Sequence, residues 1–330
     1  MNQSFKNSFV ITKTPLRVSF YGGGTDMPYF FNKHSGKTIS STIDKFIYVT
    51  VKIHSNFSEK YRLNYYETEI VNKIDNIKNI RIKETLKHFK IKVPLYINTF
   101  ADLPTNSGLG SSSAFLVGLI KAIFVLKGKK IIDKKIAELA FKIEDKITKG
   151  TTGKQDHYIS SYGGLNEIIY NKNSTRVIPL KLNKKNQKII NKNLLFIWTG
   201  ISRSSSTNLV FQKNNYKKNE KNLVNLNQFT KIFIDELKKK RINIKNIGSL
   251  LSKSWELKKK FSKKISNNKL DKIYNYIINR GAFGGKLLGA GGGGFFMFLC
   301  PKKIQSQLSK KYNRVNLKID FKKSDICINE

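Results

Sequence analysis

One apolar segment, residues 111–127, constrains the fold more than any other part of the sequence. It reads SSSAFLVGLIKAIFVLK and is entered through the Gly- and Ser-rich turn Pro104–Ala114. The segment is too short, and too promptly interrupted by charge, to span a bilayer. Because it is apolar on almost every side, it requires burial among other elements. We therefore predict a central core helix over residues 111–127.

Strand-like and helix-like segments alternate on both sides of this helix. The chain has 330 residues, of which 39% are hydrophobic, which is enough for two ordinary cores. The interleaving predicts a mixed α/β (α+β) class rather than an all-β fold or a helix bundle. An Asn- and Lys-rich stretch, 181–193, reads as an exposed loop, and we place the domain boundary there, giving domains 1–185 and 186–330. Strands are expected over 8–13, 46–53, 93–99, 163–170, 194–200 and 315–320, with a strand pair around 286–300, and helices over 76–90, 131–147, 204–213, 219–240, 244–262, 268–279 and 302–312.

Composition excludes several classes of protein. Aromatic residues make up 12% of the chain, which is too many for wholesale disorder. Two cysteines, Cys300 and Cys327, can neither staple a fold of this size nor build a zinc site, so we expect thiols in a reducing compartment. The N-terminus lacks the clean apolar run of a secretory signal, and no window is long enough to span a membrane. These features predict a cytoplasmic protein.

The formal net charge is +40, which by itself would suggest nucleic-acid binding. However, only eight of the 62 basic residues are Arg, whereas base and phosphate recognition favours arginine forks. The lysines are spread along the chain among many Asn and Ile, as a biased genome composition would produce. We therefore disfavour a nucleic-acid partner. The positive field should still attract small anions.

The turn before the core helix has the physical properties of a phosphate cradle. Gly108 and Gly110 permit close backbone approach, and Ser111 opens the helix, whose N-terminus offers unpaired N–H donors and partial positive charge. It is not a Walker A loop, because the one Gly-Lys-Thr in the chain, at 36–38, is preceded by Phe31 where that motif needs Gly. The alternative is that the Gly and Ser residues merely cap a core helix.

Two further glycine clusters interrupt apolar strands. The stretch 15–26, PLRVSFYGGGTD, places three glycines before Asp26, and 284–296 reads GGKLLGAGGGGFF. Glycine costs about 1 kcal/mol relative to Ala in a regular element, so a bare turn would not need this many. Close approach of a ligand would explain them. An ordinary flexible turn and a tight β-turn remain the alternative explanations.

Two acids stand out between these clusters. Glu144 lies on the amphipathic helix 131–147, and Asp156 follows the loop GTTGKQ. Such a pair can divide two tasks, since one carboxylate can hold a metal while the other accepts a proton. Taken singly, an acid of this kind is more often a surface residue or a helix cap.

Taken together and in this order, the clusters resemble the GHMP kinase family. The family's central motif, Pro-x-x-x-Gly-Leu-Gly-Ser-Ser, matches at 104–112, and the N-terminal and C-terminal glycine motifs match as well. The resemblance covers residues 9 to about 320. It implies an N-terminal ribosomal-protein-S5-like domain, a C-terminal ferredoxin-like domain and an active site between them. It also implies ATP- and Mg²⁺-dependent phosphorylation of a small-molecule hydroxyl.

The resemblance also implies roles for individual residues. Asp156 matches the catalytic aspartate, and Arg17 matches the basic residue beside it. Ser112 and Glu144 would ligate Mg²⁺, and Gly289–Gly293 would close over the site. The residues expected to hold ATP are Pro104, Ser107, Gly108, Leu109, Gly110, Ser111, Ser112 and Ser113.

Within the family, the segment Phe20–Asp26 resembles the sugar kinases that phosphorylate the anomeric C1 hydroxyl of a heptose 7-phosphate. On this interpretation Asp26 accepts hydrogen bonds from sugar hydroxyls, and Arg203 holds the distal phosphate, with Lys154 and Lys37 as weaker candidates. The alternatives are a kinase of an unphosphorylated sugar such as L-fucose or galactose, a pseudokinase, and a non-catalytic nucleic-acid-binding protein. The expected substrate-binding residues are Gly23, Gly24, Thr25, Asp26, Arg203, Gly291 and Gly292.

Overall fold

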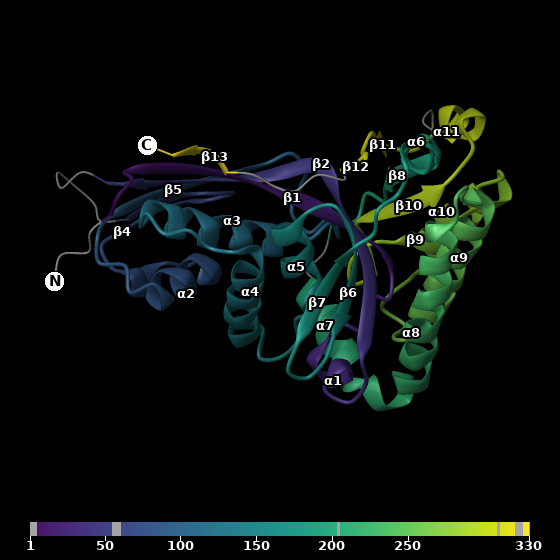
Figure 1. Cartoon of the computed structure of the whole chain (residues 1–330), viewed down its shortest axis with the longest axis horizontal. Helices are drawn as coiled ribbons and strands as arrows, with labels where there is room; N and C mark the ends of the chain where they lie inside the picture. Colours follow the sequence, from purple (N-terminus) through teal and green to yellow (C-terminus); the bar gives the residue numbers. More distant parts are fainter. Residues whose placement is uncertain (1–4, 55–60, 203–204, 309–310, 321–325, 330) are drawn as a thin grey trace.

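The computed structural model describes residues 5–54, 61–202, 205–308, 311–320 and 326–329 (Figure 1). Its strands are β1 (Phe9–Tyr21), β2 (Gly36–Ile53), β3 (Tyr61–Asn64), β4 (Thr68–Val71), β5 (Leu95–Ala101), β6 (Leu165–Tyr170), β7 (Thr175–Pro179), β8 (Leu194–Trp198), β9 (Gly284–Leu287), β10 (Phe295–Leu299), β11 (Arg314–Val315), β12 (Ile319–Asp320) and β13 (Ile326–Asn329). Its helices are α1 (Pro28–Phe31), η1 (Ile74–Asn76, a 3₁₀ turn), α2 (Ile80–His88), α3 (Ser111–Leu126), α4 (Asp133–Thr148), α5 (Gln155–Tyr162), α6 (Lys184–Asn193), α7 (Ser205–Asn214), α8 (Tyr216–Lys238), α9 (Ile244–Lys259), α10 (Asn268–Asn279) and α11 (Lys302–Leu308).

Within these ranges the strands form two sheets. The first has the order β13-β1-β2-β5-β3-β4, with β12 and β6 also paired to β2, and β7 paired to β6. The second has the order β11-β8-β10-β9. The two halves of the chain therefore each supply a sheet, although β12 and β13 return from the C-terminal half to the first sheet.

The predicted core helix is present as α3. It lies on the first sheet together with α2, α4 and α5, on the side below the strands in Figure 1. Most of its side chains are buried, from Ser111 to Leu126. At Gly118 an added Cβ would lie 2.7 Å from Thr14 Oγ1, and Thr12 Oγ1 donates to the Gly118 carbonyl at 3.1 Å. A glycine inside this helix thus allows it to pack closely on β1.

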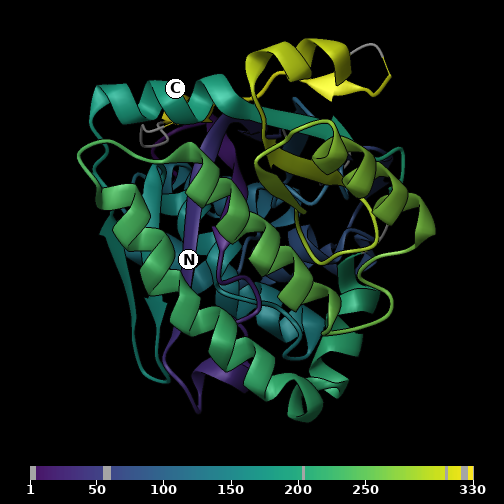
Figure 2. The same cartoon turned by 90° about the vertical axis from the view of Figure 1, so that its right-hand side faces the viewer.

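The long helices of the second half cover the second sheet, as Figure 2 shows from the side. Helix α9 packs on β9 and β10, and α8 lies against α9 and reaches β2. Trp255 of α9 is fully buried, and its ring meets Phe296 at a centroid distance of 6.0 Å. The aromatic side chains of the glycine-rich hairpin therefore anchor it in the core.

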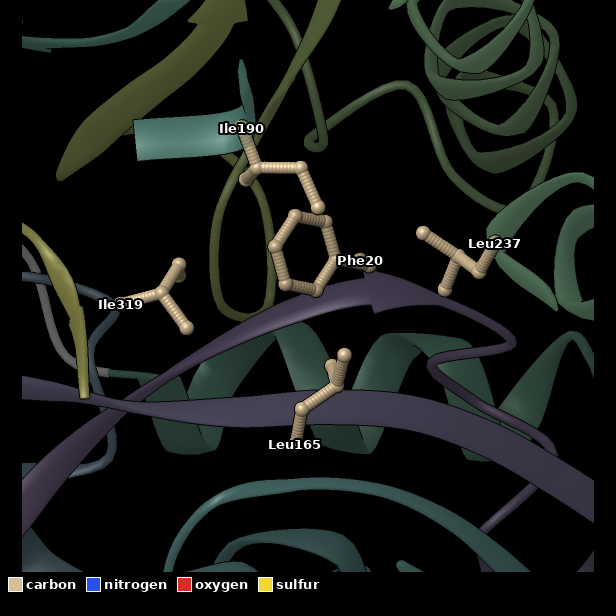
Figure 3. Close-up of a pocket in the computed structure, with 5 residues that line it drawn as sticks. All are labelled: Phe20, Leu165, Ile190, Leu237 and Ile319. Atoms are coloured by element: carbon tan, nitrogen blue, oxygen red, sulfur yellow. The ribbon is translucent and has the colours of Figure 1, made fainter. Parts of the chain in front are cut away.

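The first sheet meets α6 and α8 at an apolar seam that retains a small cavity of about 10 Å³ (Figure 3). This is about the space of one water molecule, and the lining is entirely apolar. The seam is consequently close-packed, and the halves of the chain share one continuous core. The cavity is lined by Phe20, Leu165, Ile190, Leu237 and Ile319.

The prediction of an exposed loop over 181–193 was wrong, because most of that stretch forms α6. The side chain of Asn183 accepts a hydrogen bond from the Asn186 backbone N–H, which caps the helix. Ile190 is buried on its inner face while the lysines remain outside. The single strand predicted near 315–320 is instead two short strands, β11 and β12, and the helix predicted over 302–312 ends at Leu308.

Candidate active site

An ion pair between Arg17 and Asp156 lies at the centre of the candidate site. Arg17 Nε and NH2 donate to the two carboxylate oxygens of Asp156 at 2.7 Å and 2.6 Å. Burial would raise the pKa of Asp156, but the charge of Arg17 and its hydrogen bonds hold the pKa below its usual value. The carboxylate is therefore ionised at neutral pH. Asp156 lies in the first turn of α5, directly after a loop, as the sequence predicted.

The start of α3 contacts the same guanidinium group. Arg17 NH1 donates to the Gly108 carbonyl at 2.6 Å, and the Arg17 backbone N–H donates to the Leu109 carbonyl at 2.9 Å. Gly110, the N-cap of α3, has a φ of +79°, and an added Cβ would lie 3.0 Å from Arg17 Cγ. The register of β1 against β2 shifts between Pro15 and Arg17, and such a bulge re-aims side chains. The helix start and Asp156 therefore lie on either side of one arginine.

The glycine-rich turn also leaves polar groups ready for an anion. The hydroxyls of Ser107 and Ser111 are buried and have no hydrogen-bond partner among the described residues. No acidic residue stands in the first turn of α3, and Ser112 is exposed there. Buried hydroxyls without partners cost free energy unless a ligand satisfies them. These donors, together with the helix N-terminus, fit phosphate groups in kind.

Contact between loops explains the C-terminal glycines. At Gly289, which has a φ of +72°, an added Cβ would lie 2.7 Å from Gly108 Cα, and at Gly294 it would clash with the Ser107 carbonyl. The Phe295 backbone N–H donates to that carbonyl at 3.1 Å. The two glycine-rich loops therefore touch directly, which places the second half of the chain against the phosphate cradle.

Gly291 and Gly292, expected to bind substrate, instead pack on Ile265. An added Cβ at Gly291 would lie 2.8 Å from Ile265 Cα, and the Gly292 backbone N–H donates to the Ile265 carbonyl at 2.6 Å. Close packing thus accounts for glycine at 291, and a φ of +79° accounts for glycine at 292. Substrate contact at these positions stays a prediction.

Glu144 is buried on α4 and is held by Arg81 of α2. Arg81 Nε and NH2 donate to its two oxygens at 2.8 Å and 2.6 Å. His157, which follows Asp156, is fully buried nearby; burial lowers its pKa, while the charges of Glu144 and Asp156 raise it. The charges of both acids of the sequence hypothesis therefore act on the pKa of the same histidine. A buried carboxylate and the exposed Ser112 hydroxyl are oxygen ligands of the kind Mg²⁺ prefers.

Asp26 fixes the start of the helix that carries Asp156. Its carboxylate accepts hydrogen bonds from the backbone N–H groups of Gly24 at 2.9 Å and Gln155 at 3.2 Å. A Cβ at residue 153 would clash with the same carboxylate. The close approach of Asp26 to the backbone therefore requires Gly153. Burial raises the pKa of Asp26, and the charge of Asp156 adds to the rise. The two acids are therefore neighbours, with Asp26 acting as a tertiary cap of α5.

The turn before Asp26 is closed by hydrogen bonds to the next strand. Thr25 Oγ1 donates to the carbonyls of Gly22 at 2.8 Å and Lys37 at 2.9 Å. Gly22 and Gly24 have φ values of +80° and +106°, which explains two of the three glycines. Gly23 has no such conformation, and an added Cβ would meet nothing closer than 3.4 Å. This glycine is the one that the local packing leaves unexplained.

The basic residues considered for the substrate phosphate have different outcomes. Arg203 lies outside the described residues. The Lys154 ammonium donates to Thr175 Oγ1 at 3.2 Å and lies 4.4 Å from the centre of the Phe31 ring, so it is half-buried against the protein. Lys37 contributes its backbone to the turn just described. None of the three is shown to face Asp156.

Sequence reasoning missed two buried lysines beside the site. Lys286 of β9 is 2% exposed, and its ammonium donates to the Phe20 carbonyl at 3.2 Å. Burial lowers its pKa, and the charges of Lys258 and Arg17 lower it further. Lys258 donates to the Gly289 carbonyl. The sequence does carry a signal for Lys286, because this lysine interrupts an apolar run. It carries none for Lys258, which lies within a lysine-rich stretch.

Comparisons with known proteins agree with this geometry. The model of the GHMP kinases N-terminal domain matches residues 77–164, and that of the GHMP kinases C-terminal domain matches residues 233–314. D-glycero-alpha-D-manno-heptose 7-phosphate kinase of Campylobacter jejuni is 31% identical over 92% of this chain and 91% of its own. Mevalonate kinase of Methanocaldococcus jannaschii is 28% identical over 94% of this chain and 98% of its own.

A solved structure shows the same fold. It is that of a D-glycero-D-manno-heptose 1-phosphate kinase from Bacteroides thetaiotaomicron and has a TM-score of 0.74, with 21% identity, over 97% of this chain and 99% of that one. The resemblance of the glycine clusters and the expected two-domain α/β fold are thereby confirmed. None of the described helices has both the length and the apolar character needed to cross a bilayer. The chain belongs to the GHMP kinase family, and it is a phosphotransferase that uses ATP and acts on an alcohol group of a small molecule.

Proposed function

We propose that the chain transfers the γ-phosphoryl group of ATP to the anomeric C1 hydroxyl of a heptose 7-phosphate, giving heptose 1,7-bisphosphate and ADP. The observation that carries the chemistry is the Arg17–Asp156 pair beside the start of α3. Support for the sugar comes from the relative at 31% identity, which is named for that substrate, and from the Gly-Gly-Gly-Thr-Asp turn.

In the proposed mechanism Asp156 accepts the proton of the attacking hydroxyl. The hydroxyl oxygen forms a bond to the γ-phosphorus while the bond from that phosphorus to the leaving oxygen of ADP breaks. Asp156 is ready for this task because Arg17 keeps it ionised. Arg17 and the N-terminus of α3 would stabilise negative charge on the transferring group.

Magnesium fits the oxygen donors of Glu144 and Ser112, which we propose as its protein ligands. When bound, the ion neutralises charge on the phosphates and helps to align them. The phosphates themselves would be held by the turn before α3. Its proposed contacts are Pro104, Ser107, Gly108, Leu109, Gly110, Ser111, Ser112 and Ser113.

We propose that Asp26 contacts the sugar hydroxyls in addition to capping α5. A carboxylate has about four acceptor sites, and two are taken by backbone N–H groups, so acceptors remain. Gly23 and Thr25 belong to the same turn, and an approach by the substrate would explain Gly23, where an added Cβ would meet only ordinary contacts at 3.4 Å and beyond. Arg203 stays the first candidate for the distal phosphate, because its planar fork matches phosphate geometry.

We also propose the domain division 1–185 and 186–330. Support comes from the second sheet, which begins with β8 just after this boundary. The matched family regions fall on either side of it.

The test is a substrate panel measured by ADP release with Mg-ATP. It includes heptose 7-phosphate, L-fucose, galactose and mevalonate, and phosphorus NMR of the product identifies the acceptor oxygen. Preference for heptose 7-phosphate with a C1-phosphate product supports the proposal. Preference for an unphosphorylated sugar would replace it with the alternative activity. Preference for mevalonate, or turnover of none of the four compounds, would refute heptose 7-phosphate as the acceptor.

A further inference from the structure

Arg81 occupies a place in α2 that its own helix does not favour. Asn79 caps α2 by accepting from the Ile82 backbone N–H, so Arg81 lies in the first turn, and that turn holds no acidic residue. A positive side chain near a helix N-terminus interacts unfavourably with the helix dipole. Its placement is instead accounted for by Glu144, which it reaches across to α4.

The contact uses both oxygens of the Glu144 carboxylate. Nε of Arg81 donates to Oε2 at 2.8 Å, and NH2 donates to Oε1 at 2.6 Å. The Glu144 side chain is 5% exposed, while that of Arg81 is 31% exposed, so the guanidinium lies on the solvent side of the carboxylate. Little of the carboxylate is left for another cation to approach.

We propose that Arg81 is a positioning residue that neutralises Glu144 in the nucleotide-free enzyme and gives the carboxylate up when Mg-nucleotide binds. The inference rests on the proposed function, in which Glu144 is a magnesium ligand. Arginine and Mg²⁺ then compete for the same two oxygens. The pair keeps a buried carboxylate from standing uncompensated before the metal arrives.

The pair is separable from the docking of α2. A second ion pair joins the same helices, since Lys146 Nζ of α4 lies 2.6 Å from Glu84 Oε2 of α2. Glu84 therefore supplies a matched control: its removal weakens the α2–α4 contact but leaves the oxygens of Glu144 paired. Loosening of α2 and release of Glu144 can thus be told apart.

The experiment measures binding rather than turnover. The affinity of the non-hydrolysable analogue AMP-PCP is determined by calorimetry in saturating Mg²⁺ and again in excess EDTA. The metal-dependent ratio is the dissociation constant in EDTA divided by that in Mg²⁺. It reports how strongly the metal and the nucleotide favour each other's binding. It is measured for the wild type, Arg81→Ala, Arg81→Gln, Glu84→Gln and Glu144→Gln, with melting curves to confirm that each is folded.

We expect the metal-dependent ratio to increase at least about fivefold in Arg81→Ala and Arg81→Gln, which is at the lower end of typical coupling between sites. Without Arg81, the unpaired Glu144 carboxylate repels the nucleotide analogue in EDTA and binds Mg²⁺ without a competitor. Both effects therefore increase the ratio. Glu84→Gln should leave the ratio unchanged. An equal loss of affinity with and without Mg²⁺ in the Arg81 variants would overturn the proposal. It would show that Arg81 either contacts the phosphates or only supports the local fold.

Glu144→Gln separates this inference from the proposed function. If its ratio equals that of the wild type, Glu144 is not a magnesium ligand and the proposed metal site is wrong. If its ratio falls while the Arg81 variants match the wild type, the metal site stands and only the competition is refuted.

Discussion

Replacing Asp156 with Asn tests the proposed mechanism most directly. The change removes the proton acceptor and the negative charge but keeps the size of the side chain. General-base catalysis contributes about 10²–10⁴ in rate. At 1.36 kcal/mol per tenfold, this corresponds to about 2.7–5.4 kcal/mol of barrier. We therefore expect kcat to fall at least ~100-fold.

Nucleotide binding should survive this substitution. Of the two hydrogen bonds from Arg17, the Asn oxygen can keep one, and Arg17 NH1 still donates to the Gly108 carbonyl. The turn before α3 stays anchored, so the affinity for AMP-PCP should change less than about threefold. A tenfold change would represent ~1.4 kcal/mol, and the expected change in binding free energy is well below that.

The assay combines steady-state ADP release with calorimetric nucleotide binding. Asp75→Asn is the matched control, since Asp75 is an exposed carboxylate paired with Lys87. A kcat within tenfold of the wild type in Asp156→Asn would refute the role of Asp156. A large loss of AMP-PCP affinity would show instead that the ion pair mainly holds the nucleotide site together.

Three further predictions follow from the same contacts. Arg17→Met should move the acidic limb of the kcat/KM pH profile of residual activity to higher pH, because the charge and hydrogen bonds of Arg17 then no longer oppose the rise that burial causes in the pKa of Asp156; an unmoved limb contradicts this electrostatic role. Urea unfolding should show that the wild type gains stability relative to Lys286→Met between pH 7 and 10, since the lowered pKa of Lys286 means that the unfolded chain binds more protons; a constant difference argues against burial as the cause. Gly289→Ala should weaken AMP-PCP binding by about tenfold or more, as its Cβ would press on Gly108; calorimetry showing unchanged binding would mean that the two loops separate freely.

The glycine clusters were the part of the site that sequence could predict. Glycine at positions such as 108, 110 and 289 has a physical reason that is visible as a pattern, because several glycines between apolar strands are costly without a close approach. The pairing of Arg17 with Asp156 came from the family resemblance. The distance of 139 residues between them leaves no local signal, since only the packing of α5 against β1 brings them together.

Other features depend on contacts that no local pattern encodes. Helix α6 was missed because its polar face dominates its composition, and only Ile190 and the Asn183 cap mark it as a helix. The partner of Glu144 was missed because Arg81 belongs to another helix. Asp26 was expected to serve the substrate alone, whereas its bond to the Gln155 backbone appears only once α5 is placed.

The pairing of β13 with β1 has a consequence for how the enzyme is made. Residues 10–12 of the strand that carries Arg17 pair with residues 326–329. Roughly 300 residues are synthesised between them, which at ~5–20 residues per second takes about 15–60 s. During that time one edge of β1 is open, and an unpaired edge is a template for aggregation. Ribosome-bound chains are therefore expected to need protection of this edge until residues 326–329 have been made and can pair with it.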